Sequence, residues 1–273
     1  MGIVNLTDDS FSGDGFGGQV QRAIDHGFKL VEEGAHILDI GGESSRPGAE
    51  PVSLSSELER VLPVLEGLRN CGVPLSIDTM KPQVMHEALM AGADMVNDIA
   101  ALREPGALEA VFASDCAICL MHMQGEPRTM QQSPSYEDVV HEVRTFLAER
   151  LESVRVAGIA MNRIVLDPGF CFGKMLAHNL TLLCHLNDVR VEALPLLAGL
   201  SRKSMLGQLT GRSVQERGAA SLAASLLAVQ RGAAIVRVHE VAAMRDALCV
   251  LEAMEPSESS EVPKEQERKE HGS

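Results

Sequence analysis

Polar and charged side chains follow the apolar runs of this chain, at the points where buried strands would meet solvent. The run 196–200 has the composition of a strand buried on both faces, and it breaks into Ser201-Arg202-Lys203-Ser204. Short loops after parallel strands converge on one rim, where α/β proteins bind their ligands. The residues in corresponding positions along the chain are Asn5, Glu43, Asp78, Asn97, His122, Asp167, Lys203, Arg237 and His239.

These residues separate by chemistry into two groups. The acceptors Asp78, Asn97 and Asp167 can face a ring that presents adjacent N–H and NH2 donors, since a carboxylate matches such a pair with two parallel hydrogen bonds. Charge-assisted bonds to phosphate oxygens are each worth about 1.5–3 kcal/mol. The residues suited to phosphate are Arg46, Arg237, His239 and Asn5. Together the two groups predict a site for a heterocycle that carries a phosphate ester.

The elements that must position these residues alternate regularly. Eight apolar runs each precede a helical stretch, and eight strand–helix units is the number that closes a (β/α)8 TIM barrel. We therefore predict one α/β barrel domain over residues 1–255. Residues 256–273 are rich in Glu, Lys and Ser and are expected to form a disordered, charged C-terminal tail. The expected strands are 1–6, 36–40, 73–77, 93–96, 117–121, 163–166, 196–200 and 234–238; the expected helices run up to 33 and over 53–70, 81–91, 104–114, 136–157, 178–188, 214–231 and 241–254.

Composition excludes several classes of function. The 273 residues carry a formal net charge of −14, which argues against a general nucleic-acid binder. No apolar run approaches the roughly 20 residues that span a bilayer, so no membrane partner is expected. Six irregularly spaced cysteines and the lack of a signal-peptide pattern indicate a reducing cytoplasm. Aromatic residues make up 3% of the chain, which disfavours base-stacking platforms.

Three local patterns have alternative interpretations. Gly13, Gly15 and Gly18 match the dinucleotide fingerprint G-x-G-x-x-G, with Asp39 about 20 residues on, but they begin too far after the first strand for its tight turn. Cys116 and Cys119 have metal or redox spacing, yet positions i and i+3 of a strand point to opposite faces, which favours two buried thiols. His122 can be either structural or functional.

Taken in series, eight motifs at the strand ends resemble those of the dihydropteroate synthase family, the pterin-binding barrels of folate synthesis. The resemblance covers about residues 2–240, in order and with barrel spacing. The motifs are GIVNLTDDSFSGDG, DIGGESSRPGA, SIDTMKP, VNDI, LMHMQGEP, LDPGFCFGK, GLSRKSM and IVRVHE.

The resemblance implies a transferase that condenses hydroxymethyl-dihydropterin pyrophosphate with p-aminobenzoate, giving dihydropteroate and pyrophosphate. The positions that match the family's pterin pocket are Asp78, Asn97, Met121, Asp167, Gly199, Lys203 and Arg237. Those that match its pyrophosphate site are Asn5, Arg46, Arg237 and His239, with Asn5 at the Mg2+. Those that match its p-aminobenzoate site are Ser45, Arg46, Pro47, Phe172, Ser201 and Lys203. Lys203, Asp167, Arg237 and Asp78 are the expected catalytic residues.

The implied chemistry is an SN1-like transfer, in which Mg2+ and the cations neutralise the departing pyrophosphate and the amine attacks afterwards. Loops 7–18 and 43–52 are expected to close over the site and exclude water. A homodimer and sulfonamide binding in the p-aminobenzoate site are implied by the resemblance alone. Two alternatives stay open: a pterin-barrel methyltransferase, which would have no use for the cations, and a decayed paralogue that binds pterin without turnover.

The chain departs from the family pattern at a few places. Thr7-Asp8-Asp9 lacks the usual proline of the first loop, and Ser45 replaces a threonine. Cys171 stands where the family has glycine and is expected to stiffen its loop. The chain also begins at its first expected strand, without the upstream residues usual in the family.

Overall fold

The computed structural model describes residues 1–6 and 16–254, and the side chains from residue 19 onward in the second range. Its strands form one parallel sheet in sequence order, β1 to β8. A parallel bridge joins Gly2 of the first strand to Val238, two residues after the last strand. The strands are β1 (Gly2–Asn5), β2 (Leu38–Gly41), β3 (Leu75–Asp78), β4 (Met95–Asp98), β5 (Ala117–Met121), β6 (Ile164–Asp167), β7 (Leu196–Ala198) and β8 (Ala233–Val236).

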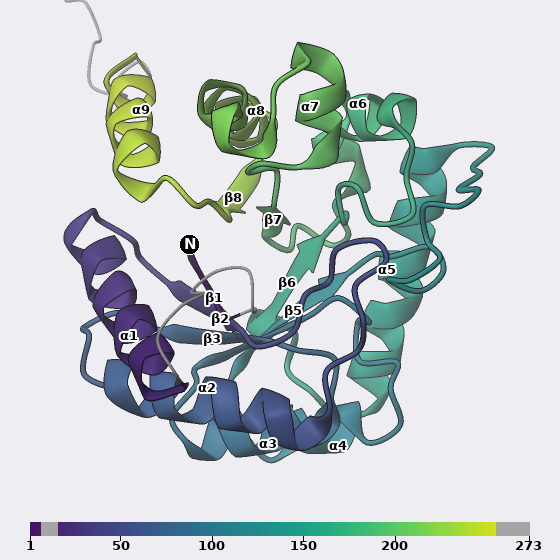
Figure 1. The fold of residues 1–273 in the computed structure, drawn as a ribbon. Helices are drawn as coiled ribbons and strands as arrows, with labels where there is room; N and C mark the ends of the chain where they lie inside the picture. The colour runs from purple at the N-terminus through teal and green to yellow at the C-terminus, as the bar shows by residue number, and fades with distance from the viewer. Residues whose placement is uncertain (7–15, 255–273) are drawn as a thin grey trace, which may run out of the picture.

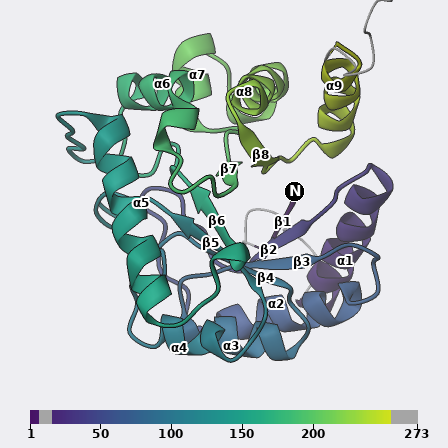
Figure 2. The ribbon, with the colours of Figure 1, turned by 180° about the vertical axis from the view of Figure 1, so that it is seen from behind.

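Helices surround this sheet on its outside, which confirms the predicted (β/α)8 TIM barrel (Figure 1; Figure 2 shows the same ring from behind). They are α1 (Phe16–Glu32), α2 (Leu54–Leu68), α3 (Pro82–Met90), α4 (Ala107–Phe112), α5 (Val139–Val156), α6 (Leu176–Cys184), α7 (Ser204–Thr210), α8 (Gly218–Gln230) and α9 (Val241–Met254). The short helix α7 was not predicted. The helix expected over 214–231 begins only at Gly218, because 214–216 form a separate 3-10 turn.

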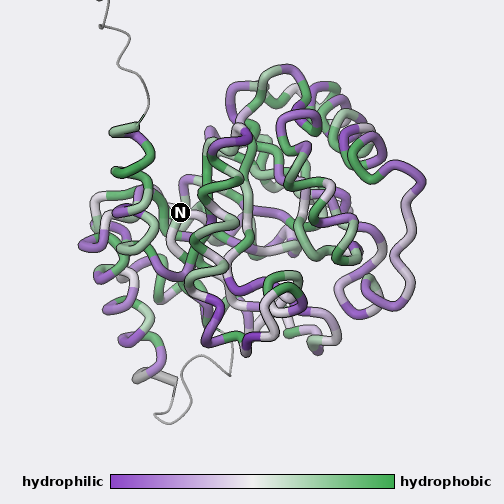
Figure 3. The backbone as a smooth tube through the Cα atoms, turned by 90° about the horizontal axis from the view of Figure 1, so that it is seen from above, coloured by the Kyte–Doolittle hydropathy of each residue, from purple (hydrophilic) through white to green (hydrophobic). Residues whose placement is uncertain are grey.

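Local sequence accounts for several of these helices. The side chain of Ser53 caps α2 by accepting from Ser56 N, and Asp138 caps α5 by accepting from Val140 N and His141 N. Hydrophobic and hydrophilic residues alternate along the outer helices, as Figure 3 shows. Their apolar faces pack on the sheet in one continuous core. A smaller cluster fills the inside of the barrel and comprises Met95, Cys119, Val165 and Leu197.

Strand register places polar side chains in layers inside the barrel. Asp39 of β2 pairs with Ser76 of β3, which pairs with Met95 of β4. Two residues further toward the carboxyl ends, Asp78 pairs with Asn97. Alternate residues of a strand share a face, so the Asp39 layer lies directly below the Asp78 layer.

The cysteine and membrane expectations can be compared with the described residues. All six cysteines are free, and Cys116 and Cys119 are buried thiols as predicted. None of the helices in the two described ranges has the length and apolarity needed to cross a bilayer. The expected tail over 256–273 and the glycine pattern at Gly13 and Gly15 lie outside the described residues, as does most of the loop 7–18.

Candidate functional site

The structure brings the predicted residues to one rim, at the carboxyl ends of the strands. Asp78, Met121 and Asp167 are the last residues of β3, β5 and β6, and Asn97 is the penultimate residue of β4. The other predicted residues lie at the end of β1 or in the loops that follow β2, β6, β7 and β8: Asn5, Ser45, Arg46, Pro47, Phe172, Gly199, Ser201, Lys203, Arg237 and His239.

A buried ion cluster forms the floor of this rim. Arg237 donates from Nε to Asp39 Oδ2 at 2.5 Å and from Nη2 to Asp78 Oδ2 at 2.8 Å. Asn97 Nδ2 also donates to Asp39 Oδ2, at 3.1 Å, which leaves the Asn97 amide oxygen directed elsewhere. Asp39 is 0% exposed, so its carboxylate acts from below the rim as an anchor for both partners.

One guanidinium facing two carboxylates sets the charge of the cluster. Burial opposes the charged form of Arg237, but Asp39 and Asp78 outweigh it and raise the pKa of Arg237. Burial raises the pKa of Asp78 to about 7, with Arg237 lowering it and Asp39 raising it. Burial likewise raises the pKa of Asp167 to about 6, against the hydrogen bond from Gly169 N at 2.7 Å. Both rim carboxyls therefore change protonation near neutral pH, as is common at functional sites.

Several cations lie close enough to His239 to affect its ionisation. The ring accepts or donates at Nδ1 to Ser201 Oγ, 2.9 Å away. Burial lowers the pKa of His239 to about 3, and four cations lower it further. These cations are Arg202, Arg237, Arg46 and Lys203. Arg202 also pairs with Glu240 at 2.5 Å, and the remaining positive field makes this part of the rim suited to an anion, which would in turn raise the pKa of His239.

The loop after β6 carries an aromatic residue to the site. The Lys203 ammonium lies 4.2 Å from the centroid of the Phe172 ring, a cation–π contact. Phe172 also belongs to an apolar patch on the rim with Ile99, Met121, Met123 and Met130, against which Met80 packs. Cys171, beside it, has φ +66°, a backbone conformation that favours glycine. Its expected stiffening of the loop stays a prediction.

The loop after β2 is tied to the barrel by a second ion cluster. Lys81 Nζ bridges Glu43 Oε2 at 2.6 Å and Glu57 Oε2 at 2.5 Å. Glu57 is 0% exposed and also accepts from Thr79 Oγ1 at 2.7 Å. Glu43 accepts in addition from Val52 N at 2.9 Å, which closes the base of the loop 43–52. Glu43, a strand-end residue in the sequence, therefore holds this loop.

His122 has a structural role in the described residues. Its Nδ1 lies 2.8 Å from Lys174 Nζ, and its ring packs edge-on against Phe146. Burial, followed by the charge of Lys174, lowers the pKa of His122 to about 2. The ring is thus neutral, and its Nδ1 accepts a hydrogen bond from Lys174 Nζ.

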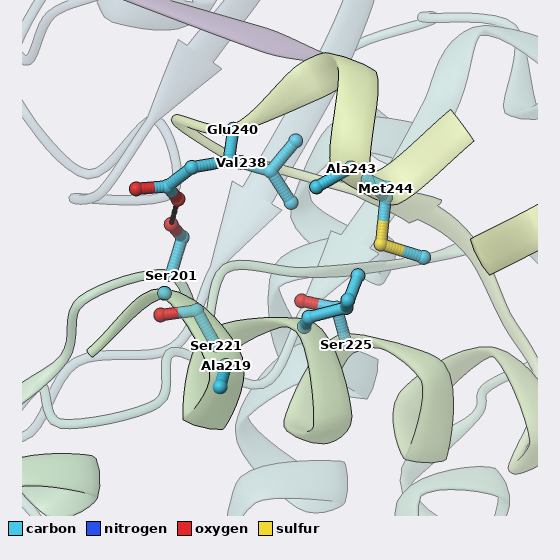
Figure 4. Close-up of a pocket in the computed structure, with 10 residues that line it drawn as sticks. Ser201, Ala219, Ser221, Ser225, Val238, Glu240, Ala243 and Met244 are labelled. Atoms are coloured by element: carbon cyan, nitrogen blue, oxygen red, sulfur yellow. Dashed lines mark hydrogen bonds between the residues drawn. The ribbon is translucent and has the colours of Figure 1, made fainter. Parts of the chain in front are cut away.

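A separate cavity of about 150 Å³ lies between α8 and α9. Figure 4 shows Ser201 at its edge, with its hydroxyl bonded to Glu240 at 3.4 Å. Ser225 Oγ is buried there and has no hydrogen-bond partner among the described residues. Pockets for drug-sized ligands measure about 300–1,000 Å³, so this cavity is too small for a heterocycle with a diphosphate. The predicted site is the open rim beside it.

Mg2+ is compatible with the residues of the rim. Within residues 1–6 and 16–254, no group of three or more His, Cys, Asp or Glu side chains could hold a metal ion. However, Mg2+ is usually held by one or two protein oxygens together with substrate phosphates. Asn5 ends β1 at the rim and is half-buried, so its amide oxygen fits such a shared site.

Sequence reasoning missed the residues that act from below the rim. It treated Asp39 only as part of a dinucleotide fingerprint, and it assigned no role to Lys174, Lys81 or Glu57. A charged residue inside the apolar run 36–40 was the available signal for Asp39. The side-chain partners of Lys174 and Lys81 are His122, Glu43 and Glu57, which lie on distant segments, so the sequence offers no comparable signal for these two lysines.

Comparisons with known proteins agree with this geometry. The family model described as pterin binding enzyme matches residues 1–239. A dihydropteroate synthase of Neisseria meningitidis serogroup C is 53% identical over 259 residues, which cover 93% of this chain and 92% of that protein. The solved dihydropteroate synthase of Xanthomonas albilineans with 4-aminobenzoic acid is 52% identical, with a TM-score of 0.88 over 94% of this chain and 93% of that one. That of Burkholderia cenocepacia complexed with 7,8-dihydropteroate is 52% identical, with a TM-score of 0.85 over 93% and 90%.

Proposed function

The chain belongs to the pterin-binding enzyme family, and within it to the dihydropteroate synthases, and from this we infer how its rim residues divide the work of one reaction. It is a transferase of folate biosynthesis that joins hydroxymethyl-dihydropterin pyrophosphate to p-aminobenzoate. The products are dihydropteroate and pyrophosphate. The single observation that carries the assignment of roles is the meeting of buried carboxylates and a group of cations on one rim.

The pterin end of the first substrate binds over the Arg237 cluster. Asp78 and Asp167 accept from the N–H and NH2 donors of the ring, and the free amide oxygen of Asn97 adds a third acceptor. Met121 supports the flat apolar face of the ring. Gly199, whose Cβ position has no atom within 4 Å, leaves room beside it, while Lys203 and Arg237 border the ring.

The pyrophosphate binds on the side of the rim where the cations gather. Arg46, Arg237 and His239 face its oxygens, and the fields of the arginines favour the charge that develops as it leaves. Asn5 would hold Mg2+ through its amide oxygen. When bound, Mg2+ would neutralise part of the leaving group's charge.

p-Aminobenzoate binds between the loops after β2, β6 and β7. Phe172 offers an aromatic face, and Lys203 beside it offers a cation for the carboxylate or the ring. The remaining contacts come from Ser45, Arg46, Pro47 and Ser201. A sulfonamide that resembles p-aminobenzoate would occupy the same position.

The reaction follows an SN1-like course in this arrangement. Carbon–oxygen cleavage at the pterin methylene leaves positive charge that spreads into the ring, where Asp78 and Asp167 stabilise it. The neutral aromatic amine then attacks the methylene and loses a proton. No general base is required of the chain, because an aniline nitrogen is uncharged at neutral pH. Closure of the loop 43–52 over the rim would keep water from the cation.

Other properties of the chain stay proposals of the same kind. We propose that residues 1–255 form the one catalytic domain, that it forms homodimers, and that it binds neither nucleic acid nor membranes. Free thiols at all six cysteines support a reducing, cytoplasmic location.

An assay of pyrophosphate release with Mg2+ tests the proposed function. We expect release only when both pterin pyrophosphate and p-aminobenzoate are present. Pterin binding without release would support the decayed paralogue instead. A methyltransferase is disfavoured, because methyl transfer has no use for the cations around His239.

A further inference from the structure

We propose that Lys174 is a positioning residue for the second substrate, because its ammonium holds the loop that presents Phe172 to Lys203. The inference rests on the proposed function, in which Phe172 and Lys203 bind p-aminobenzoate. Lys174 itself lies behind this site and contacts neither substrate in the arrangement described above.

The ammonium of Lys174 has three hydrogen-bond acceptors around it. Its Nζ donates to Gly169 O at 2.9 Å and to Phe172 O at 3.1 Å, and it lies 2.8 Å from His122 Nδ1. An ammonium has three donors and no acceptor, so this set of partners satisfies every N–H bond. The two carbonyls belong to the turn before Lys174, and His122 is the residue that directly follows the strand β5.

Burying the Lys174 ammonium costs solvation free energy, which indicates that this lysine has a role other than stabilising the fold. Lys174 is 3% exposed, and its hydrogen-bond partners include no carboxylate. Burial lowers its pKa to about 7, although Asp167 and Cys171 nearby favour the charged form. A methionine would fill this space without a buried charge, but it would leave the carbonyl of Phe172 without the hydrogen bond from Lys174.

The backbone of the turn over residues 169–173 needs hydrogen-bond donors of this kind. Gly169, Cys171 and Gly173 all have positive φ, at +68°, +66° and +63°. Within this turn the backbone supplies a hydrogen bond from Phe172 N to Gly169 O at 3.1 Å, but the carbonyl of Phe172 needs a partner from outside the backbone ladder. Phe172 is the residue whose carbonyl Lys174 holds and whose ring lies 4.2 Å from Lys203 Nζ. A change in the direction of that carbonyl therefore moves the ring relative to Lys203.

Contacts that do not involve the Lys174 side chain hold Cys171 and Gly173 of this turn. Asn179 Oδ1 accepts from Cys171 N at 2.7 Å, and Tyr136 donates to Gly173 O at 2.8 Å. Gln131 donates to Cys171 O. A variant without the ammonium should consequently retain the fold and lose the hydrogen bond that holds the carbonyl of Phe172.

The test compares the KM values of both substrates in the variant Lys174→Met. Pyrophosphate release is measured while each substrate is varied, with circular dichroism and thermal melting as checks of folding. We expect KM for p-aminobenzoate to rise about tenfold or more, as for the loss of a charge-assisted hydrogen bond, and KM for pterin pyrophosphate to stay within about twofold. Lys29→Met, at a lysine whose side chain is 69% exposed, is the matched control and should change neither.

The possible results separate the inference from the proposed function. Equal changes in both KM values, or none, in a folded Lys174→Met protein would overturn the positioning role. A wild-type protein that releases no pyrophosphate would overturn the proposed function itself. If Lys174→Met does not fold, the same comparison is made with Lys174→Gln, which keeps two N–H donors. In Lys174→Gln, a higher KM for p-aminobenzoate alone supports the inference. A higher KM for both substrates contradicts it.

Discussion

Replacing Asp39 with asparagine removes one negative charge from beneath the pterin site and keeps the shape of the side chain. In the wild-type protein, burial raises the pKa of Asp78 to about 7, and the charge of Asp39 contributes to the increase. Arg237 stays charged in either protein, because its pKa is raised above an already high value. The variant therefore retains the cation beside Asp78 and loses the competing anion. The pKa of Asp78 should fall.

The size of the effect follows from the contacts. Asp39 and Asp78 share one guanidinium, which lies 2.5 Å from the first carboxylate and 2.8 Å from the second, and two carboxylates that share a site raise the pKa of one of them. We expect a decrease of at least about one, which corresponds to about 1.4 kcal/mol. Since the ionised carboxylate binds the ring donors, pterin affinity falls as the pH drops through the pKa of Asp78. In Asp39→Asn this fall should occur at a pH lower by about one or more.

The assay is pterin binding by titration calorimetry from about pH 5 to about pH 9, on both sides of this pKa. Loss of the bond from Arg237 to Asp39 also weakens binding at high pH, by about 1.5–3 kcal/mol, so the midpoint and not the absolute affinity is the readout. Asp115→Asn, at an exposed aspartate, should leave the midpoint unchanged. A midpoint that stays in place or rises in Asp39→Asn would refute the assignment of charges in this cluster.

Three further changes test other parts of the molecule. Lys203→Ala should lower turnover by about a hundredfold or more while the circular dichroism spectrum is unchanged, and a near-normal rate would remove Lys203 from the site. Lys81→Met leaves the buried carboxylate of Glu57 without its cation and should lower the free energy of unfolding in urea by about 3 kcal/mol. A loss under about 1 kcal/mol there would mean that the ion pair between Lys81 and Glu57 contributes little to stability. Asp138→Ala removes the cap of α5 and should cost about 1 kcal/mol, seen as a melting temperature lower by roughly 2–4 °C; no shift would mean that the cap contributes nothing.

The barrel itself was predictable because its signals are local. Each strand is a short apolar run, and each rim residue follows such a run directly, as Asp78 and Asp167 do. Parallel strands place their carboxyl ends together whatever the details of packing. The eight strands, the positions of the rim residues and the family could all be obtained in this way from a few consecutive residues at a time.

The details of the helices were less accessible. The helix α7 has only seven residues, too few for an apolar period to stand out. The helix predicted from residue 214 begins at Gly218, because Ser213 and Glu216 form a capping box around a separate 3-10 turn. Such boundaries depend on side-chain hydrogen bonds that the hydrophobic pattern does not report.

By itself, then, the sequence determined which residues stand at the rim and that they would meet. Only the tertiary structure decided which of them bind one another. Arg237 pairs with Asp39 across 198 positions of the chain, and Lys174 reaches His122 across 52. These pairs exist because the barrel closes and brings β8 beside β1 and β6 beside β5. The energy of a buried charge depends on the groups that surround it in space, and neither spacing nor residue type along the chain specifies those groups.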